Sequence, residues 1–228
     1  MAIFLVDLPP NEMERRLGEA LSVYVDAMRY PRGTENQRAA MWLEHIRRPG
    51  WKGVAVLEVP DVPEAPEAPD APDVPAAEAG GQAAHVPPAA ELSNAPLLGV
   101  AYGYPGAPGQ WWQQQVVLGM QRCGLPPADI AHLMDSYFEL TELHIHPRAQ
   151  GQGLGEALAR RLLADRSERY VLLSTPEDPS TPGEPSTPGE PNRAWRLYRR
   201  LGFTDLIRRY NFAGDPRPFA ILGRALPL

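Results

Sequence analysis

Three glycines alternate with larger residues in the segment 150–155, between a strand-like run and a helix-like run. Gly151, Gly153 and Gly155 allow a sharp backbone turn and keep side chains away from an approaching ligand. Leucines recur at helical spacing from 153 to 166, so the unpaired N–H groups of a helix N-terminus should follow the turn directly. A turn of this kind binds anions, and pyrophosphate is its natural ligand.

Two common phosphate-binding motifs do not fit this glycine spacing. The dinucleotide pattern Gly-x-Gly-x-x-Gly is not matched, and the acid expected about 20 residues later is replaced by Ser174, Thr175 and Pro176. The Walker motif needs a lysine after its glycines, and the only lysine of the chain is Lys52. A nicotinamide enzyme is therefore disfavoured, and a phosphate loop built from backbone groups remains.

Two stretches of the sequence together resemble one known family. Ile145-His146-Pro147 ends a strand-like run and is followed by Gln150, Gly153 and Gly155, which resembles the acetyl-CoA motif of the GCN5-related N-acetyltransferases. The stretch 194–203 resembles the Ala-x-x-Leu-Tyr-x-x-Leu-Gly-Phe signature of the same family. The two stretches occur in the family's order, with one helix and one strand between them. The resemblance implies an enzyme, an N-acetyltransferase with acetyl-CoA as co-substrate and an amine as acceptor.

The resemblance also implies which residues hold acetyl-CoA. The strand that ends near Ile145 should splay from its neighbour and leave its main-chain groups free for the pantetheine amides. The sequence departs from the family at Pro191, where many members have an asparagine seven residues before the signature tyrosine. The expected cofactor contacts are Leu143, Ile145, Gln150, Gly151, Gln152, Gly153, Leu154, Gly155 and, one residue late, Asn192.

Four residues are candidates for moving protons. The resemblance places Tyr198 where a phenol protonates the leaving thiolate, although the alternative is an aromatic core residue. Glu139, four residues before Leu143, is the preferred general base, and an ion pair with an arginine is its alternative. Glu142 is the second candidate base and His144 the third, although the pattern favours polar residues on the sheet surface for both.

Around these residues, strand and helix patterns alternate. Strands are predicted at 2–6, 53–59, 97–104, 137–146, 170–174, 203–210 and 219–222, and helices at 11–29, 35–47, 111–124, 153–166 and 193–201. The pattern predicts an α/β (α+β) fold, a mixed sheet with helices on its faces. The resemblance adds a mostly antiparallel order and a splay between two central strands. We expect one domain over 1–228.

Two segments interrupt this pattern. In the segment 60–96, prolines recur at every third residue from 60 to 75 among Ala, Val, Glu and Asp, and an Ala/Gly-rich stretch follows, which favours an extended, disordered insertion. A docking ligand for a proline-binding groove is the alternative. The loop 176–191 contains a perfect repeat of Ser-Thr-Pro-Gly-Glu-Pro and has no large side chain that could build a core.

Composition limits the other functions. The net charge of −6 arises in the segment 60–96, whose seven acids leave +1 for the rest of the chain. The arginines form no basic stripe, so a nucleic-acid partner is not expected. No apolar run is long enough to span a membrane, and the single Cys123 favours the cytoplasm. A non-catalytic acyl-CoA sensor or scaffold is the alternative function, and a homodimer is left open.

Overall fold

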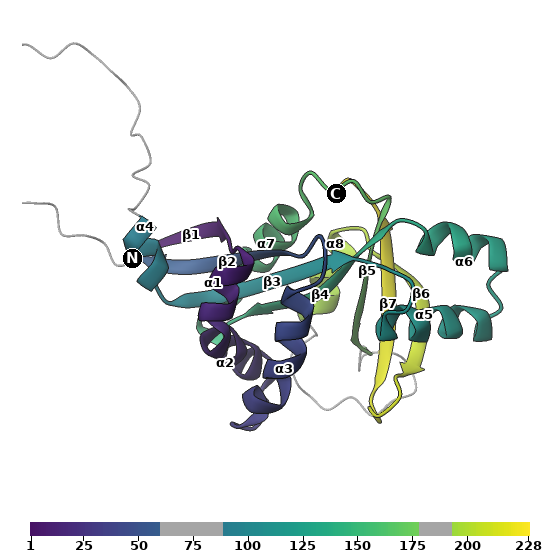
Figure 1. The fold of residues 1–228 in the computed structure, drawn as a ribbon, viewed down its shortest axis with the longest axis horizontal. Coiled ribbons are helices and arrows are strands. Elements are labelled where there is room, and N and C mark those ends of the chain that lie inside the picture. Colours follow the sequence, from purple (N-terminus) through teal and green to yellow (C-terminus); the bar gives the residue numbers. More distant parts are fainter. Residues whose placement is uncertain (60–88, 178–192) are drawn as a thin grey trace, which may run out of the picture.

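The structure is a computed structural model that describes residues 1–59, 89–177 and 193–228. Most of the predicted insertion 60–96 and nearly all of the loop 176–191 lie outside these residues, so their predicted disorder is not tested. The described residues form one mixed sheet covered by helices on both faces (Figure 1). This architecture confirms the predicted fold class.

The sheet has seven strands in the order β1-β2-β3-β4-β5-β7-β6. All neighbouring pairs are antiparallel except β4 and β5, which are parallel. The long connection between β2 and β3 therefore joins two antiparallel neighbours. The strands are β1 (Ala2–Asp7), β2 (Lys52–Val59), β3 (Leu97–Pro105), β4 (Tyr137–Ile145), β5 (Tyr170–Pro176), β6 (Thr204–Asn211) and β7 (Pro218–Ala225).

Helices cover the sheet in three groups (Figure 1). Helices α7 and α8 pack on one face, whereas α1–α3 and α5–α6 cover the two halves of the other face. The helices are α1 (Pro10–Arg15), α2 (Leu17–Met28), α3 (Thr34–Ile46), α4 (Ala89–Asn94), α5 (Trp111–Arg122), α6 (Pro127–Met134), α7 (Leu154–Leu163) and α8 (Arg193–Arg200), with a 3₁₀ turn at Pro147–Ala149.

Side-chain alternation along the strands divides the core into layers. On β2, Val54 and Val56 face α7 and α8, whereas Ala55 and Leu57 face α1–α3. The same alternation on β5 and β7 sends every second residue to the α5–α6 layer. Continuous burial on both faces explains why the central strands read as apolar runs in the sequence.

Two details differ from the expected elements. The predicted helix 11–29 is interrupted at Arg16, which separates α1 from α2. The Arg16 guanidinium is buried and donates to the carbonyl oxygen of Ala95 at 2.5 Å, while it also pairs with Glu19. The segment 89–96, predicted as part of a disordered insertion, therefore belongs to the fold, and it contains α4. Helix α6 was not predicted.

None of the helices in the described ranges is long and apolar enough to cross a membrane.

Candidate active site

Strand β4 leaves its parallel neighbour β5 after the first third of its length. Its pairing with β5 covers only Tyr137, Phe138 and Glu139, although both strands continue beyond that point. Because the N–H of His146 bonds to Leu98 of β3, alternation turns the main-chain groups of residues 143 and 145 away from β3 and toward the opened side. The predicted splay is therefore present, with the main chain of Leu143 and Ile145 at its edge.

A β-bulge in β4 brings the two candidate acids to one face of the sheet. Glu142 lies opposite Tyr102 of β3, whereas Leu140 lies opposite the next residue, Gly103, so Thr141 is an extra residue in β4. In a regular strand, residues three apart point to opposite faces. Because of the extra residue, the side chain of Glu142 points to the same face as that of Glu139. Glu139, Glu142 and His144 therefore all lie on the face that α1–α3 cover.

Glu139 is almost completely buried on this face. One carboxylate oxygen, Oε1, accepts a hydrogen bond from the Tyr104 hydroxyl at 3.3 Å, while Oε2 is buried and has no partner in the described structure. Burial raises the pKa of Glu139 from 4.5 to about 8, and the charge of Arg48 opposes this rise only in part. The alternative of a close ion pair is not found, because no arginine lies within ion-pair distance of Glu139 among the described residues.

Glu142 and His144 form a close pair beside α2. The Nε2 atom of His144 lies 2.5 Å from a carboxylate oxygen of Glu142, and both side chains are largely buried. The Tyr24 ring of α2 contacts the imidazole edge-on, with centroids 4.9 Å apart. Burial raises the pKa of Tyr24 and of Tyr102, and the negative charge of Glu142 raises both further. The charge of Glu142 therefore acts on the aromatic residues around it.

Tyr198 comes to the same place from the opposite side of the sheet. It lies on α8, where its ring packs edge-on against Phe203 at 5.6 Å. Burial raises the pKa of Tyr198, and the charge of Glu142 raises it further. Glu142 lies on the other face of the sheet, so its charge acts on Tyr198 across the sheet. The phenol therefore stays protonated at neutral pH.

The glycine turn has the conformation that the sequence predicted. Gly151 and Gly153 have φ angles of +83° and +78°, a region that favours glycine, and a Cβ atom on either would meet nothing within 4 Å. Gly155 has a different role, since a Cβ there would lie 3.2 Å from Leu197 of α8. Gly153 caps the N-terminus of α7, so free N–H groups face open space here.

Gln150 ties this turn to its surroundings. Its side-chain amide donates to the carbonyl oxygen of Ile145 at 2.9 Å and accepts from Arg193 of α8 at 2.7 Å. Gln152 is exposed and Leu154 is half-buried at the start of α7. These residues fit a pyrophosphate and a pantetheine arm, because the N–H groups, the open space and the edge of β4 that β5 does not pair with lie in succession. Asn192 lies outside the described residues.

Several residues of the site had no role in the sequence analysis. Tyr104 donates a hydrogen bond to Glu139, and Tyr102 lies two residues before it on β3. Residues two apart on a strand point to the same face, so this spacing could have indicated that the two tyrosines lie together. Tyr24 and Arg48 come from helix regions whose approach to β4 depends on tertiary packing. Within the described ranges, no cluster of His, Cys, Asp and Glu could hold a metal ion.

Comparisons with known proteins agree with this geometry. A family described as an acetyltransferase (GNAT) domain matches residues 111–205. The chain is 71% identical over 228 residues, the full length of both proteins, to the GCN5-like protein acetyltransferase Rv2170 of Mycobacterium tuberculosis. These matches favour the enzyme over a non-catalytic sensor or scaffold.

Solved structures share the fold at low sequence identity. Arabidopsis thaliana NAA60 in complex with acetyl-CoA matches with a TM-score of 0.52 and 13% identity over 99% of each chain. An acetyltransferase from Thermus thermophilus matches with a TM-score of 0.51 and 13% identity over 99% of this chain and 98% of its own. With the splay, the glycine turn and a full-length relative in agreement, the chain belongs to the GNAT family of acetyl-CoA-dependent N-acetyltransferases.

Proposed function

We propose that this enzyme transfers the acetyl group to the side-chain amine of a lysine in a protein. The relative that is 71% identical over its full length is named a protein acetyltransferase, and the match covers the whole of both chains. The observation that carries the proposal is the bulge at Thr141, which gathers Glu139 and Glu142 on the face opposite α7. An acceptor amine that reaches that face lies beside the carboxylates of Glu139 and Glu142, which can accept its proton. The lone Cys123 supports a cytoplasmic location.

The proposed cofactor contacts are the main-chain groups of Leu143 and Ile145 together with residues 150–155. When bound, acetyl-CoA supplies an acetyl group activated as a thioester. The chain's own residues then orient this group at the opening between β4 and β5 and exclude water from it, and alignment of this kind can supply much of the rate.

Glu139 is the proposed general base. Its carboxylate has one unpartnered oxygen, Oε2, and its pKa of about 8 lies close to the operating pH, where a base is most effective. In its ionised form it accepts a proton from the ammonium form of lysine, whose ordinary pKa is about 10.4. Glu142, with His144 beside it, is the competing base because it is more exposed than Glu139 and its charge acts on Tyr198.

Tyr198 is the proposed acid. Burial, with a smaller contribution from the charge of Glu142, raises the pKa of Tyr198, so its hydroxyl keeps its proton at neutral pH. The phenol can therefore donate this proton to the sulfur as the thiolate leaves.

The test of the function is acetyl transfer to peptides that each contain one lysine. The purified protein, acetyl-CoA and such peptides should give acetylated lysine, detected by mass spectrometry together with free thiol release. Peptides with a blocked side-chain amine and a free N-terminus provide the control. Transfer to N-termini alone, or to small amines alone, would contradict the proposed acceptor.

A further inference from the structure

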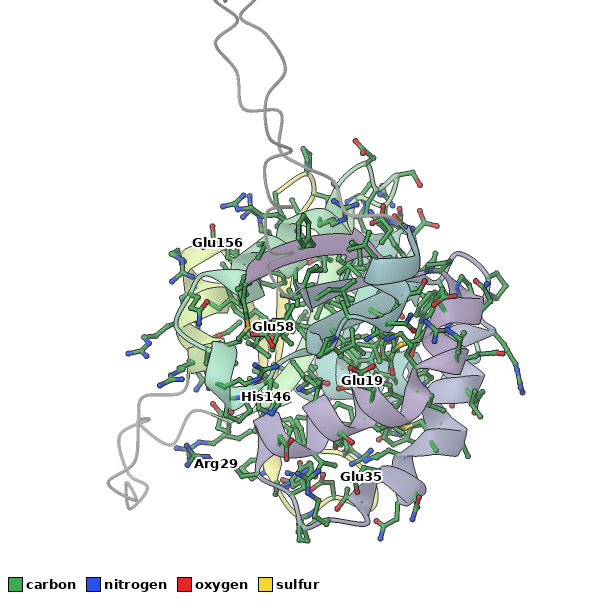
Figure 2. The ribbon with its side chains drawn as sticks, turned by 90° about the vertical axis from the view of Figure 1, so that its left-hand side faces the viewer. Glu19, Arg29, Glu35, Glu58, His146 and Glu156 are labelled. Carbon is green, nitrogen blue, oxygen red and sulfur yellow. The ribbon has the colours of Figure 1, made fainter. Side chains whose placement is uncertain are left out.

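A cavity of about 380 Å³ lies where the turn between α2 and α3 meets the hairpin between β6 and β7. Figure 2 labels Arg29 and Glu35, which mark this turn on α2 and α3. The cavity lies on the side of the sheet that carries Glu142 and His144, because α2 and α3 cover that face. It is lined by Tyr30, Thr34, Gln37, Arg38, Met41 and Arg217.

The hairpin side of the cavity is held in place by charge pairing. Arg217 pairs with Asp215 at 2.7 Å and donates to the Tyr30 hydroxyl at 2.6 Å. This hydrogen bond joins the hairpin to the α2–α3 turn, so the two walls have a fixed separation. The positive charge of Arg217 is thereby balanced by its own neighbour.

The charge of Arg38 is not balanced in this way. The acids of the α2–α3 region, Asp26 and Glu35, both pair with Arg32, at 2.8 Å and 3.5 Å. Asp215, on which the charge of Arg38 also acts, pairs with Arg217. Among the described residues, Arg38 has no carboxylate at ion-pair distance, and its side chain contacts the sulfur of Met41 instead. The cavity therefore has a wall with an available guanidinium, which forms paired hydrogen bonds with a carboxylate.

One tyrosine connects the cavity to the candidate active site. The guanidinium carbon of Arg38 lies 5.9 Å from the centroid of the Tyr24 ring, which lies 4.9 Å from the centroid of His144. The two distances place the guanidinium no more than about 11 Å from the imidazole, a span of roughly three extended residues. Glu142 raises the pKa of Tyr24 and Arg38 lowers it, so both charges act on this ring.

We infer that Arg38 binds the carboxylate of an Asp or Glu that lies within three residues of the acceptor lysine. The enzyme then prefers lysines in acidic sequences. This inference rests on the proposed function, since it assumes a peptide acceptor that reaches Glu139 and Glu142 from the α2–α3 face. Thr34 and Gln37 supply further polar groups to the same carboxylate.

The experiment compares two peptides with a single lysine, one with Asp and one with Asn at the flanking positions. Wild-type enzyme should show a kcat/KM about fivefold higher for the Asp peptide, an effect that high salt reduces. In Arg38→Gln the ratio of the two kcat/KM values should fall to about one, and in Arg38→Lys it should remain above one. Arg47→Gln, which removes an exposed arginine just after α3 that does not line the cavity, should keep the wild-type ratio.

The outcomes separate this inference from the proposed function. Equal kcat/KM values for the two peptides in the wild type would overturn the inference while lysine acetylation stands. A wild-type ratio that persists in folded Arg38→Gln, checked by its melting temperature, would also overturn it. If wild-type enzyme acetylates neither lysine peptide but acetylates another class of amine, the proposed function fails first and the inference falls with it.

Discussion

Replacing Gly153 with valine should abolish acetyl-CoA binding in a folded protein. Gly153 has a φ of +78°, and a Cβ atom added there meets nothing within 4 Å. Gly124, in the loop after α5, has a φ of +77° and equally open space, and it lies away from the glycine turn. Gly124→Val is therefore a matched control, because both substitutions impose the same backbone strain and neither creates a clash in the free protein.

The expected magnitudes follow from this match. A side chain in the left-handed region costs about 1–2 kcal/mol, so each variant should lose that amount of unfolding free energy. For a chain of this size the loss corresponds to a fall of roughly 2–8 °C in Tm. A charge-assisted hydrogen bond contributes about 1.5–3 kcal/mol, so the loss of even one contact to pyrophosphate should raise the Kd by about tenfold or more.

Calorimetric titration with acetyl-CoA, together with thermal melting, distinguishes these effects. Gly153→Val and Gly124→Val should melt at similar temperatures, and only Gly153→Val should lose affinity. If the two variants bind acetyl-CoA equally well, the open space at Gly153 is not where the cofactor approaches, and the assignment of the turn is wrong.

Three further results are expected. Tyr198→Phe should lower kcat by roughly 10–100-fold without changing the acetyl-CoA affinity, and full activity in steady-state assays would leave Tyr198 as a core residue. Burial raises the pKa of Glu139 from 4.5 to about 8, so between these pH values the folded state keeps a proton that the unfolded chain releases. The free energy of unfolding should therefore fall as the pH rises from about 4.5 to about 8. Denaturant titrations of Glu139→Gln should lack this pH-dependent loss of stability. Arg16→Ala should lower the free energy of unfolding by about 1–3 kcal/mol, because it leaves buried carbonyl groups unpaired. Replacing the neighbouring, exposed Arg15 with alanine should lower it by less than about 1 kcal/mol. Equal losses of stability in thermal melts would contradict the role of Arg16 in holding the segment 92–97.

The elements and the cofactor turn were predictable because they depend on local patterns. Hydrophobic periodicity located every strand of the sheet to within a few residues, and the alternating glycines indicated the anion site before α7. Local patterns did not reveal the break at Arg16, since apolar spacing continues across it. Helix α6 was missed because it is short and buries few side chains.

The acceptor side could not be predicted because it is assembled from distant segments. The bulge at Thr141 has no turn residue as its signal, yet it decides whether Glu139 and Glu142 share a face. Tyr104 reaches Glu139 from β3 by sheet pairing. The contact between Arg217 and Tyr30 joins residues 187 positions apart, and only the packed structure brings them together.

The dependence of kcat/KM on pH, measured with a lysine peptide, tests the central claim most directly. If Glu139 is the base, wild-type enzyme should show an acidic limb near pH 8, separate from the titration of the lysine itself near 10.4. This limb should disappear in Glu139→Gln and remain in Glu142→Gln. A limb that persists in Glu139→Gln and disappears in Glu142→Gln would contradict the account and transfer the role of base to Glu142.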